Sequence, residues 1–377
     1  MKERLKTEDH RLKNNMNNLL LITGAGASHD IFDVNRVSFS TRNYQPPLTK
    51  DLFLFGGGIS SLYSAQCQKG HPMASQVGHD FYNSFGENSE ASNLETFLMK
   101  IKNSKSKVVQ KKFWAIPLYF FDLFEGIGRH YTSTNTPGIP SNYESLLASI
   151  SESDYDQVIW LNLNYDLLAD FVIKSTAPSN QLEDFNNYMD LVIPGKKSIK
   201  LKYTKPHGSI DWFKLIKDPQ ANSRVIDLEE IKIGKVPDDL ENLISEEVIK
   251  AHVNSDGAIV GRSRNWYPAI TAPIGKYKFV YQVHIDEIIP HLKETYTILC
   301  IGFSALDSDI LDLIDKNIPE IKKMKIVNGN GEFSGQAYDR IYAHCNRKKI
   351  SRKDSSLFTG TFSQFMQDKV NQWLSEK

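Results

Sequence analysis

Four short segments of this chain carry the residues best suited to chemistry, and each lies at the end of an expected strand. They are residues 24–28 (GAGAS), 162–166 (NLNYD), 205–212 (KPHGSIDW) and 301–304 (IGFS). In open α/β sheets, ligands bind beside the carboxyl ends of the strands. If the expected strands belong to one sheet, these segments lie at its ligand-binding edge.

The glycines of the first segment suit a phosphate-binding turn. Gly24 and Gly26 have no side chain, so backbone N–H groups can approach a pyrophosphate at the start of the next helix. The dinucleotide fingerprint of dehydrogenases needs a third glycine, but His29 occupies that position. A tight turn between a strand and a helix, without a ligand, explains the same glycines equally well.

The second segment places two amides and a carboxylate after an apolar strand. Asn162, Asn164 and Asp166 are costly to bury unless they find hydrogen-bond partners or a ligand. The competing interpretation is structural, because Asp166 precedes a helical pattern and asparagine and aspartate are favoured helix caps.

The third segment presents a histidine between a proline and a glycine. Pro206 fixes the entry of the chain, and Gly208 removes steric cover from His207. Histidine titrates near neutral pH, so His207 is a candidate general base. A structural histidine in a turn is the alternative.

The fourth segment is a short turn that could hold a ribose. Gly302 and Ser304 form the turn, and Asp307 and Asp309 follow it. The two aspartates lack further oxygen ligands at suitable spacing, so we interpret them as helix-capping residues and expect no metal.

Apolar runs alternate with helical patterns along the chain, which predicts an α/β fold with a Rossmann-like, doubly wound parallel sheet. The expected strands are 19–22, 157–163, 198–203, 270–273, 296–303 and 324–327. We expect one domain over residues 1–377, with a helical insertion at 50–150, a surface insertion at 214–268 that includes a helix at 238–252, and a C-terminal helical extension at 335–377.

The composition excludes several classes of protein. The 45 basic and 45 acidic residues balance, so we expect no direct binding to nucleic acid. No run of eighteen apolar residues is present, so no membrane span is expected. The three cysteines lie far apart, without a Cys-x-x-Cys pair, which favours a cytoplasmic protein without a four-cysteine zinc module.

Together, the segments GAGAS, LNYD, PHGSIDW and GFSALDSDI resemble the sirtuin-like domain of bacterial NAD-consuming defence proteins. The resemblance spans about residues 19–328, and it includes residues 93–97 (NLETF) and 272–276 (APIGK), for which it implies no chemical role. It implies a sirtuin-like version of the expected sheet, with NAD⁺ bound as the substrate.

The resemblance also implies a role for each matching residue. Asn164 would position the ribose and an attacking water, and His207 would be the catalytic base. The residues that would contact NAD⁺ are Gly24, Ala25, Gly26 and Ser28 at the pyrophosphate and nicotinamide-side ribose, Asp166 at the nicotinamide carboxamide, and Gly302, Ser304 and Asn328 along the adenosine half.

The implied activity is hydrolysis of NAD⁺ to nicotinamide and ADP-ribose, as the NAD-depleting effector of an anti-phage system. The missing zinc cysteines disfavour the alternative, an NAD-dependent protein-lysine deacylase. A non-catalytic NAD⁺ or ADP-ribose sensor is a third possibility. We expect a homo-oligomer, because the insertion and the polar arm before residue 19 have little use in a minimal nucleotide fold. By resemblance, the partner would be a HerA-like ATPase.

Overall fold

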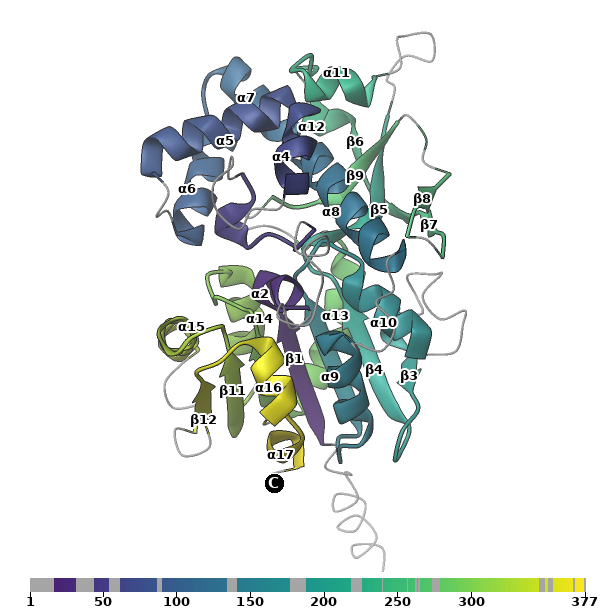
Figure 1. Cartoon of the computed structure of the whole chain (residues 1–377), viewed down its shortest axis with the longest axis vertical. Helices are drawn as coiled ribbons and strands as arrows, with labels where there is room; N and C mark the ends of the chain where they lie inside the picture. Colours follow the sequence, from purple (N-terminus) through teal and green to yellow (C-terminus); the bar gives the residue numbers. More distant parts are fainter. Residues whose placement is uncertain are drawn as a thin grey trace, which may run out of the picture.

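A seven-stranded, mostly parallel sheet forms the lower half of the molecule as drawn in Figure 1. Its strand order is β12-β11-β10-β1-β2-β4-β3, and only the edge strand β3 runs antiparallel to its neighbour. The strands are β1 (Asn18–Thr23), β2 (Gln157–Asn162), β3 (Leu191–Ile193), β4 (Ile199–Thr204), β10 (Thr295–Ile301), β11 (Lys323–Val327) and β12 (Ser355–Phe358). The computed structural model describes residues 17–31, 44–53, 62–86, 90–133, 141–176, 188–217, 226–238, 240–255, 257–261, 263, 265–272, 279–345, 350–351, 355–368 and 370–375.

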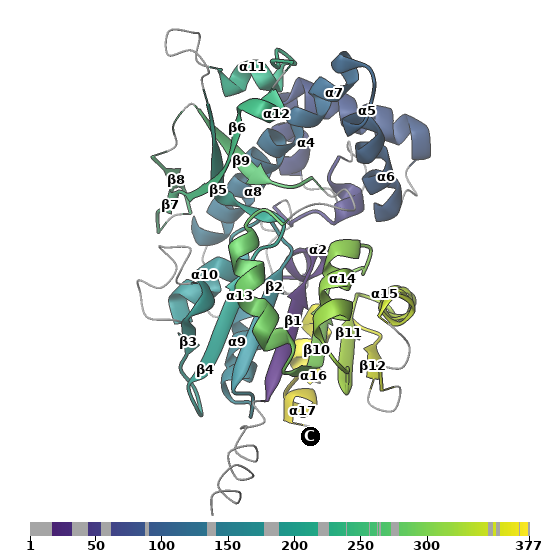
Figure 2. The ribbon, with the colours of Figure 1, turned by 180° about the vertical axis from the view of Figure 1, so that it is seen from behind.

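The central strands are buried because helices cover both faces of the sheet. All six residues of β1 and of β2 are buried, as expected for strands that read as continuous apolar runs. One face carries α9 (Asn142–Ser151), α10 (Leu168–Thr176), α16 (Phe362–Asp368) and α17 (Val370–Ser375), and the other carries α13 (Gln282–Leu292) and α14 (Ser308–Asn317) (Figures 1 and 2). The predicted α/β class with a doubly wound, mostly parallel sheet is therefore confirmed.

A second body lies over the carboxyl edge of this sheet (Figure 1). Its core joins aromatic residues such as Phe81, Phe120 and Phe213, which come from helices and from a separate sheet. The helices are α4 (Leu62–Lys69), α5 (Pro72–Phe85), α6 (Ala91–Lys102), α7 (Lys107–Trp114), α8 (Ile116–Ser133), α11 (Leu228–Lys232) and α12 (Leu240–Leu243), and the sheet has the order β6-β5-β9, with β5 (Gly208–Ile216), β6 (Ile244–Lys250) and β9 (Trp266–Ile270).

The expected insertions thus meet in one body. Residues from both 50–150 and 214–268 contribute to it, although α9, within the first range, packs beside α10, α16 and α17 over the main sheet. The helix predicted at 238–252 is wrong over most of its length, because residues 244–250 form β6 and pair with β5. The C-terminal extension holds α15 (Gly331–His344), α16 and α17, together with the unexpected strand β12. The polar arm before residue 17 and most of residues 272–276 lie outside the described residues.

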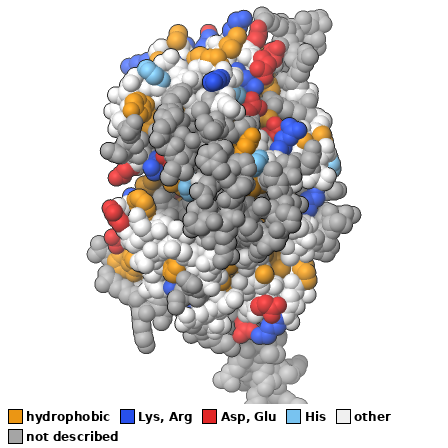
Figure 3. Space-filling view, in the orientation of Figure 1, with side chains coloured by type: hydrophobic (Ala, Val, Ile, Leu, Met, Phe, Trp, Pro, Cys, Tyr) orange, Lys and Arg blue, Asp and Glu red, His pale blue; other side chains and the backbone are white. Residues whose placement is uncertain are grey.

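Two surface properties fit the composition. Within the described residues, no helix is long and apolar enough to cross a membrane. On the face shown in Figure 3, the described lysines and arginines are scattered among acidic side chains and do not gather into one basic patch.

Candidate functional site

A cavity of about 450 Å³ lies between the carboxyl edge of the main sheet and the helical body. This volume is in the usual range for small-molecule sites. The strands converge on it because their ends are in register: Thr23 pairs with Asn162 on one side and with Ile301 on the other. Every candidate site residue named from the sequence lines this cavity: Gly24, Ala25, Gly26, Ser28, Asn164, Asp166, His207, Gly302, Ser304 and Asn328.

The glycines at the ends of β1 and β10 let two loops touch. A Cβ added to Gly24 would lie 2.4 Å from the Gly302 carbonyl oxygen, and one added to Gly302 would lie 2.1 Å from the Ala27 nitrogen. Gly302 also has a φ of 64°, a backbone conformation that favours glycine. Close packing between the loops is a sufficient reason for these glycines, and contact with a pyrophosphate stays a prediction.

The amides of the first turn already have protein partners. Gly24 N donates to Ile301 O at 2.9 Å, Gly26 N to Gly302 O at 3.3 Å, and Ala27 N to Gly24 O at 2.9 Å. The first two bonds hold the turn against the end of β10, and the third lies within the turn itself. All three N–H groups therefore already have acceptors within the protein.

Asn164 is fixed at the cavity wall by its amide nitrogen. Its Nδ2 donates to Gly24 O at 3.0 Å and to Ser28 Oγ at 2.9 Å, and it lies 3.2 Å from Tyr143 OH. Within the described part of the chain, nothing donates to its Oδ1 at hydrogen-bond distance. That oxygen is therefore free to accept from a water or a hydroxyl in the cavity. Asn162, by contrast, is fully buried and bonds Thr23 and Tyr203, so its role is structural.

Asp166 caps the helix that follows it. Its Oδ1 accepts from Leu168 N at 3.0 Å, which confirms the capping interpretation, and the side chain also borders the cavity. Burial raises the pKa of this carboxyl, and the charge of the fully buried Lys205 opposes the rise. Lys205 Nζ donates to the Asp166 carbonyl at 2.5 Å and to Asp170 at 3.0 Å, which ties the loop after β2 to the end of β4.

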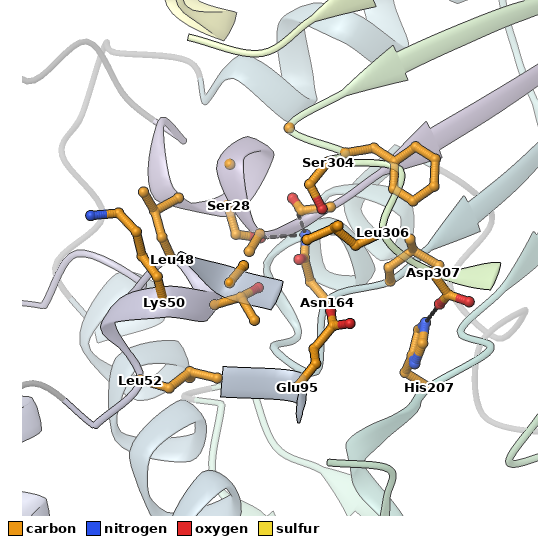
Figure 4. Close-up of a pocket in the computed structure, with 18 of the residues that line it drawn as sticks. Ser28, Leu48, Lys50, Leu52, Glu95, Asn164, His207, Ser304, Leu306 and Asp307 are labelled. Carbon is orange, nitrogen blue, oxygen red and sulfur yellow. Dashed lines mark hydrogen bonds and ion pairs between the residues drawn. The ribbon is translucent and has the colours of Figure 1, made fainter. Parts of the chain in front are cut away.

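His207 is held in an ion pair on a clamped loop. Its Nε2 lies 2.6 Å from Asp307 Oδ2, and its Nδ1 lies 3.3 Å from Thr271 Oγ1 (Figure 4). The backbone is fixed because Thr271 N donates to His207 O and Val280 N donates to Pro206 O. Burial lowers the pKa of His207, but the charge and hydrogen bond of Asp307 outweigh that effect, so the pKa lies above its ordinary value. Both ring nitrogens have protein partners in this arrangement.

Asp307 has two functions in this structure, of which the sequence indicated one. Its Oδ1 accepts from Asp309 N at 2.9 Å and from Ile310 N at 3.1 Å, so it caps α14 as expected. Its other oxygen pairs with His207. Burial opposes ionisation of Asp307, but His207 and the two backbone N–H groups lower its pKa below the usual value.

Four further charged residues line the cavity and were not assigned from the sequence: Lys50, Glu90, Glu95 and Arg340. Glu95 enters from α6 on the helical side, within a segment whose family resemblance carried no role. Arg340 enters from α15, and its Nη1 donates to the Ser304 carbonyl at 2.8 Å. Nearby, Asn328 Nδ2 lies 3.3 Å from the Phe303 carbonyl. Only the three-dimensional arrangement brings these residues together, because the sequence gives no register between the helical body and the sheet.

Metal binding has no evident site among the residues that the structure describes. Nowhere in those ranges do three or more His, Cys, Asp or Glu side chains form a group suited to a metal ion.

Comparisons with known proteins add a distant likeness. No family model and no curated protein matches the chain. One solved structure, from work on the structural basis for the mechanism and regulation of Sir2 enzymes, is 12% identical over 99% of this chain and 98% of its own, with a TM-score of 0.37. Another, Sir2Tm bound to a propionylated peptide, is 13% identical over 97% of each chain, with a TM-score of 0.34. At these TM-scores neither likeness supports an assignment of function.

Proposed function

We propose that this chain binds NAD⁺ in the cavity and hydrolyses the bond between nicotinamide and ribose. The observation that carries the proposal is convergence. The four segments that resemble a sirtuin-like NAD⁺ site come from residues 24–28, 162–166, 205–212 and 301–304, and all of them contribute to one cavity of suitable size. The proposal requires this convergence, because a single bound dinucleotide must contact all four segments.

The polar groups at the cavity fit the chemistry of this bond. Nicotinamide leaves as a neutral molecule, so the site must stabilise an oxocarbenium-like ribose and orient a water against it. Asn164 Oδ1 is the proposed acceptor for that water and for ribose hydroxyls, because Nδ2 is already committed to the protein. His207 is proposed to act on a ribose hydroxyl, oriented by Asp307.

Negative charge in the cavity supports the same reaction. Glu95, Asp166 and Asp307 all line the cavity. Carboxylates in a partly buried site favour the positive charge that develops on the ribose in the transition state. Arg340 would then face the other, anionic half of the dinucleotide.

The wider role that we propose follows from the family resemblance. It is a cytoplasmic NAD-depleting effector of bacterial anti-phage defence, which works as a homo-oligomer with a HerA-like ATPase as its possible partner. An unregulated NAD⁺ hydrolase would harm its own cell, so the proposal requires control by assembly or by a partner. The three dispersed cysteines cannot form the four-cysteine zinc module of the protein deacylases that the chain resembles, which favours water over an acyl-lysine as the second substrate.

The direct test is to incubate the purified chain with NAD⁺, with and without an acetylated peptide, and to identify the products. We expect nicotinamide and free ADP-ribose in both reactions. His207→Ala should reduce turnover by about 10²- to 10⁴-fold, the usual effect of losing a proton-transfer group. His79→Ala, at an exposed site on α5, is the matched control and should behave as the wild type.

Each other outcome identifies an alternative. Acetyl-ADP-ribose formed only with the peptide would indicate a deacylase. Binding of NAD⁺ by calorimetry without turnover would indicate a sensor. Neither binding nor turnover would refute the proposal.

A further inference from the structure

We infer that Glu95, on the helical side of the cavity, is a catalytic residue that accepts the proton of the attacking water. The inference rests on the proposed function, since it assigns a residue within the same reaction. Sequence patterns placed the reactive groups at the sheet edge alone, so this assignment adds a group from the opposite wall.

The fold directs Glu95 into the cavity. Leu94, Leu98 and Ile101 are buried on one side of α6 and fix the helix against the aromatic core. Glu95 is consequently presented towards the sheet edge, where Figure 4 shows its carboxylate reaching towards Asn164. Asn164 bears the amide oxygen that is free to hold a water. The two groups needed to orient and to deprotonate a water therefore enter from opposite walls.

The carboxylate of Glu95 has no structural task. Among the described residues, none donates a hydrogen bond to it or forms an ion pair with it at contact distance. Two other carboxyl groups of the cavity already have structural roles: Asp307 caps α14 and pairs with His207, and Asp166 caps α10. A carboxylate that is partly buried and makes no such contacts is costly to keep, so a functional role is the better explanation.

His207 is less suited to take the proton of the water. Asp307 and Thr271 lie beside its two ring nitrogens, and the raised pKa keeps more of the imidazole protonated at neutral pH. A protonated imidazole cannot accept a proton. The proton of the water is therefore left to a second base.

The surroundings of Glu95 bring its pKa into the range that a general base needs. Burial raises the pKa of Glu95 to about 7, and the negative charge of Asp307 acts in the same direction, while His207 and Arg340 oppose it. A general base is most effective when its pKa is close to the working pH. The remaining charged groups that line the cavity are Lys50, Glu90, Asp166 and Asp309.

The step balances without any further reactant. The bond between C1′ and the pyridinium nitrogen breaks, and its electron pair leaves with neutral nicotinamide. The water oxygen forms a bond to C1′, and one of its protons passes to the Glu95 carboxylate. Glu95 then releases this proton to solvent, so NAD⁺ and water give ADP-ribose, nicotinamide and a proton.

The test compares Glu95→Gln with Glu287→Gln, which removes the same charge from an exposed position on α13. We expect Glu95→Gln to keep its affinity for NAD⁺ by calorimetry and to lose nicotinamide release by about 10²-fold or more. The wild-type rate should rise with pH through about 7, because the deprotonated form is active, and the variant should lose this dependence. Azide has no proton to lose, so it should restore nicotinamide release in Glu95→Gln alone and form azido-ADP-ribose.

Three results would overturn the inference. Turnover of Glu95→Gln within about threefold of wild type would show that no base is needed at this position. A slow variant that azide does not rescue, and that keeps the wild-type pH profile, would reduce Glu95 to a positioning residue. A wild-type chain that releases no nicotinamide would remove both this inference and the proposed function, whereas the first two results leave the function intact.

Discussion

The two walls of the cavity are built on different principles. On the sheet side, the reactive groups are interlocked: Asn164 bonds Gly24 and Ser28, and Asp307 bonds both His207 and the start of α14. On the helical side, Glu95 lies among cavity-lining neighbours such as Leu52 and Phe124 and makes no comparable contact with a described residue.

This difference shows that one wall of such a site can position the reacting groups while the other controls the protonation of a base. Hydrogen bonds across the strand ends fix the positions of the reactive side chains. A reaction at an oriented ribose depends on such fixed positions. Apolar neighbours on the helical side control the protonation state of a carboxyl. Their low dielectric raises its pKa, although no hydrogen-bond partner holds the group in place. Substitutions on the sheet side should therefore change stability as well as activity, and those at Glu95 on the helical side should change activity alone.

The largest effect on stability is expected where the two sheet-edge loops touch. Gly302→Ala would force a Cβ to within 2.1 Å of Ala27 N at a positive φ, so it should lower the free energy of unfolding by about 3 kcal/mol or more. Gly335→Ala, on α15, is the matched control, because its Cβ would meet nothing within 4 Å. It should be neutral or stabilising by about 0.5–1 kcal/mol. Urea unfolding measures both, and equal effects would contradict the packing of the loops.

An intermediate effect is expected at Asn164. Asn164→Ala removes the two hydrogen bonds from Nδ2 to Gly24 O and Ser28 Oγ, which should cost about 1–3 kcal/mol in total in the free energy of unfolding. NAD⁺ turnover should fall by about 10²-fold as the water loses its acceptor. Glu95→Gln supplies the contrast, with turnover lost and stability kept. Should Asn164→Ala unfold like the wild type, the interlocked wall would be disproved.

The smallest effect is expected at Asp307. Asparagine also caps helices well, so Asp307→Asn should keep α14 and remove only the charge beside His207, at a cost of about 1 kcal/mol. The lowered pKa of Asp307 stabilises the fold above about pH 4, and the raised pKa of His207 does so below about pH 6.5, so the cost should be greatest between these values.

The measurement for this variant is an NMR titration of His207 combined with unfolding at several pH values. The pKa of His207 should fall, because burial then acts without the opposing carboxylate. Asp227→Asn makes the same change at the cap of α11 and should leave His207 unaffected. An unchanged His207 titration in Asp307→Asn would show that the pair does not set its protonation.

The sequence predicted the sheet side of the site because local patterns encode it. Strands β1, β2 and β10 read as apolar runs, and the residues after each run must lie at one edge once the strands pair in parallel. Residues such as Gly24, Asn164 and Ser304 could be named for that reason, whereas His207 was named for its position between Pro206 and Gly208.

The helical side could not be predicted in the same way. Glu95 has no local pattern that separates it from a solvated helical glutamate, because its position in the cavity depends on how α6 packs above the sheet. The second oxygen of Asp307 shows the same limit. Its capping role is local and was predicted, whereas its partner His207 lies a hundred residues earlier in the chain. Strand β6 was mistaken for a helix because pairing with β5 overrides the local preference.

The contact between Asn164 and Gly24 has a consequence for how the site comes into being. The two residues are 140 positions apart, and residues from the last third of the chain, such as Ser304 and Arg340, complete the wall. A chain interrupted during synthesis therefore holds the early strands without a finished cavity. For the NAD⁺ hydrolase that we propose, activity would require the complete sheet, and incomplete chains would not harm the cell that makes them.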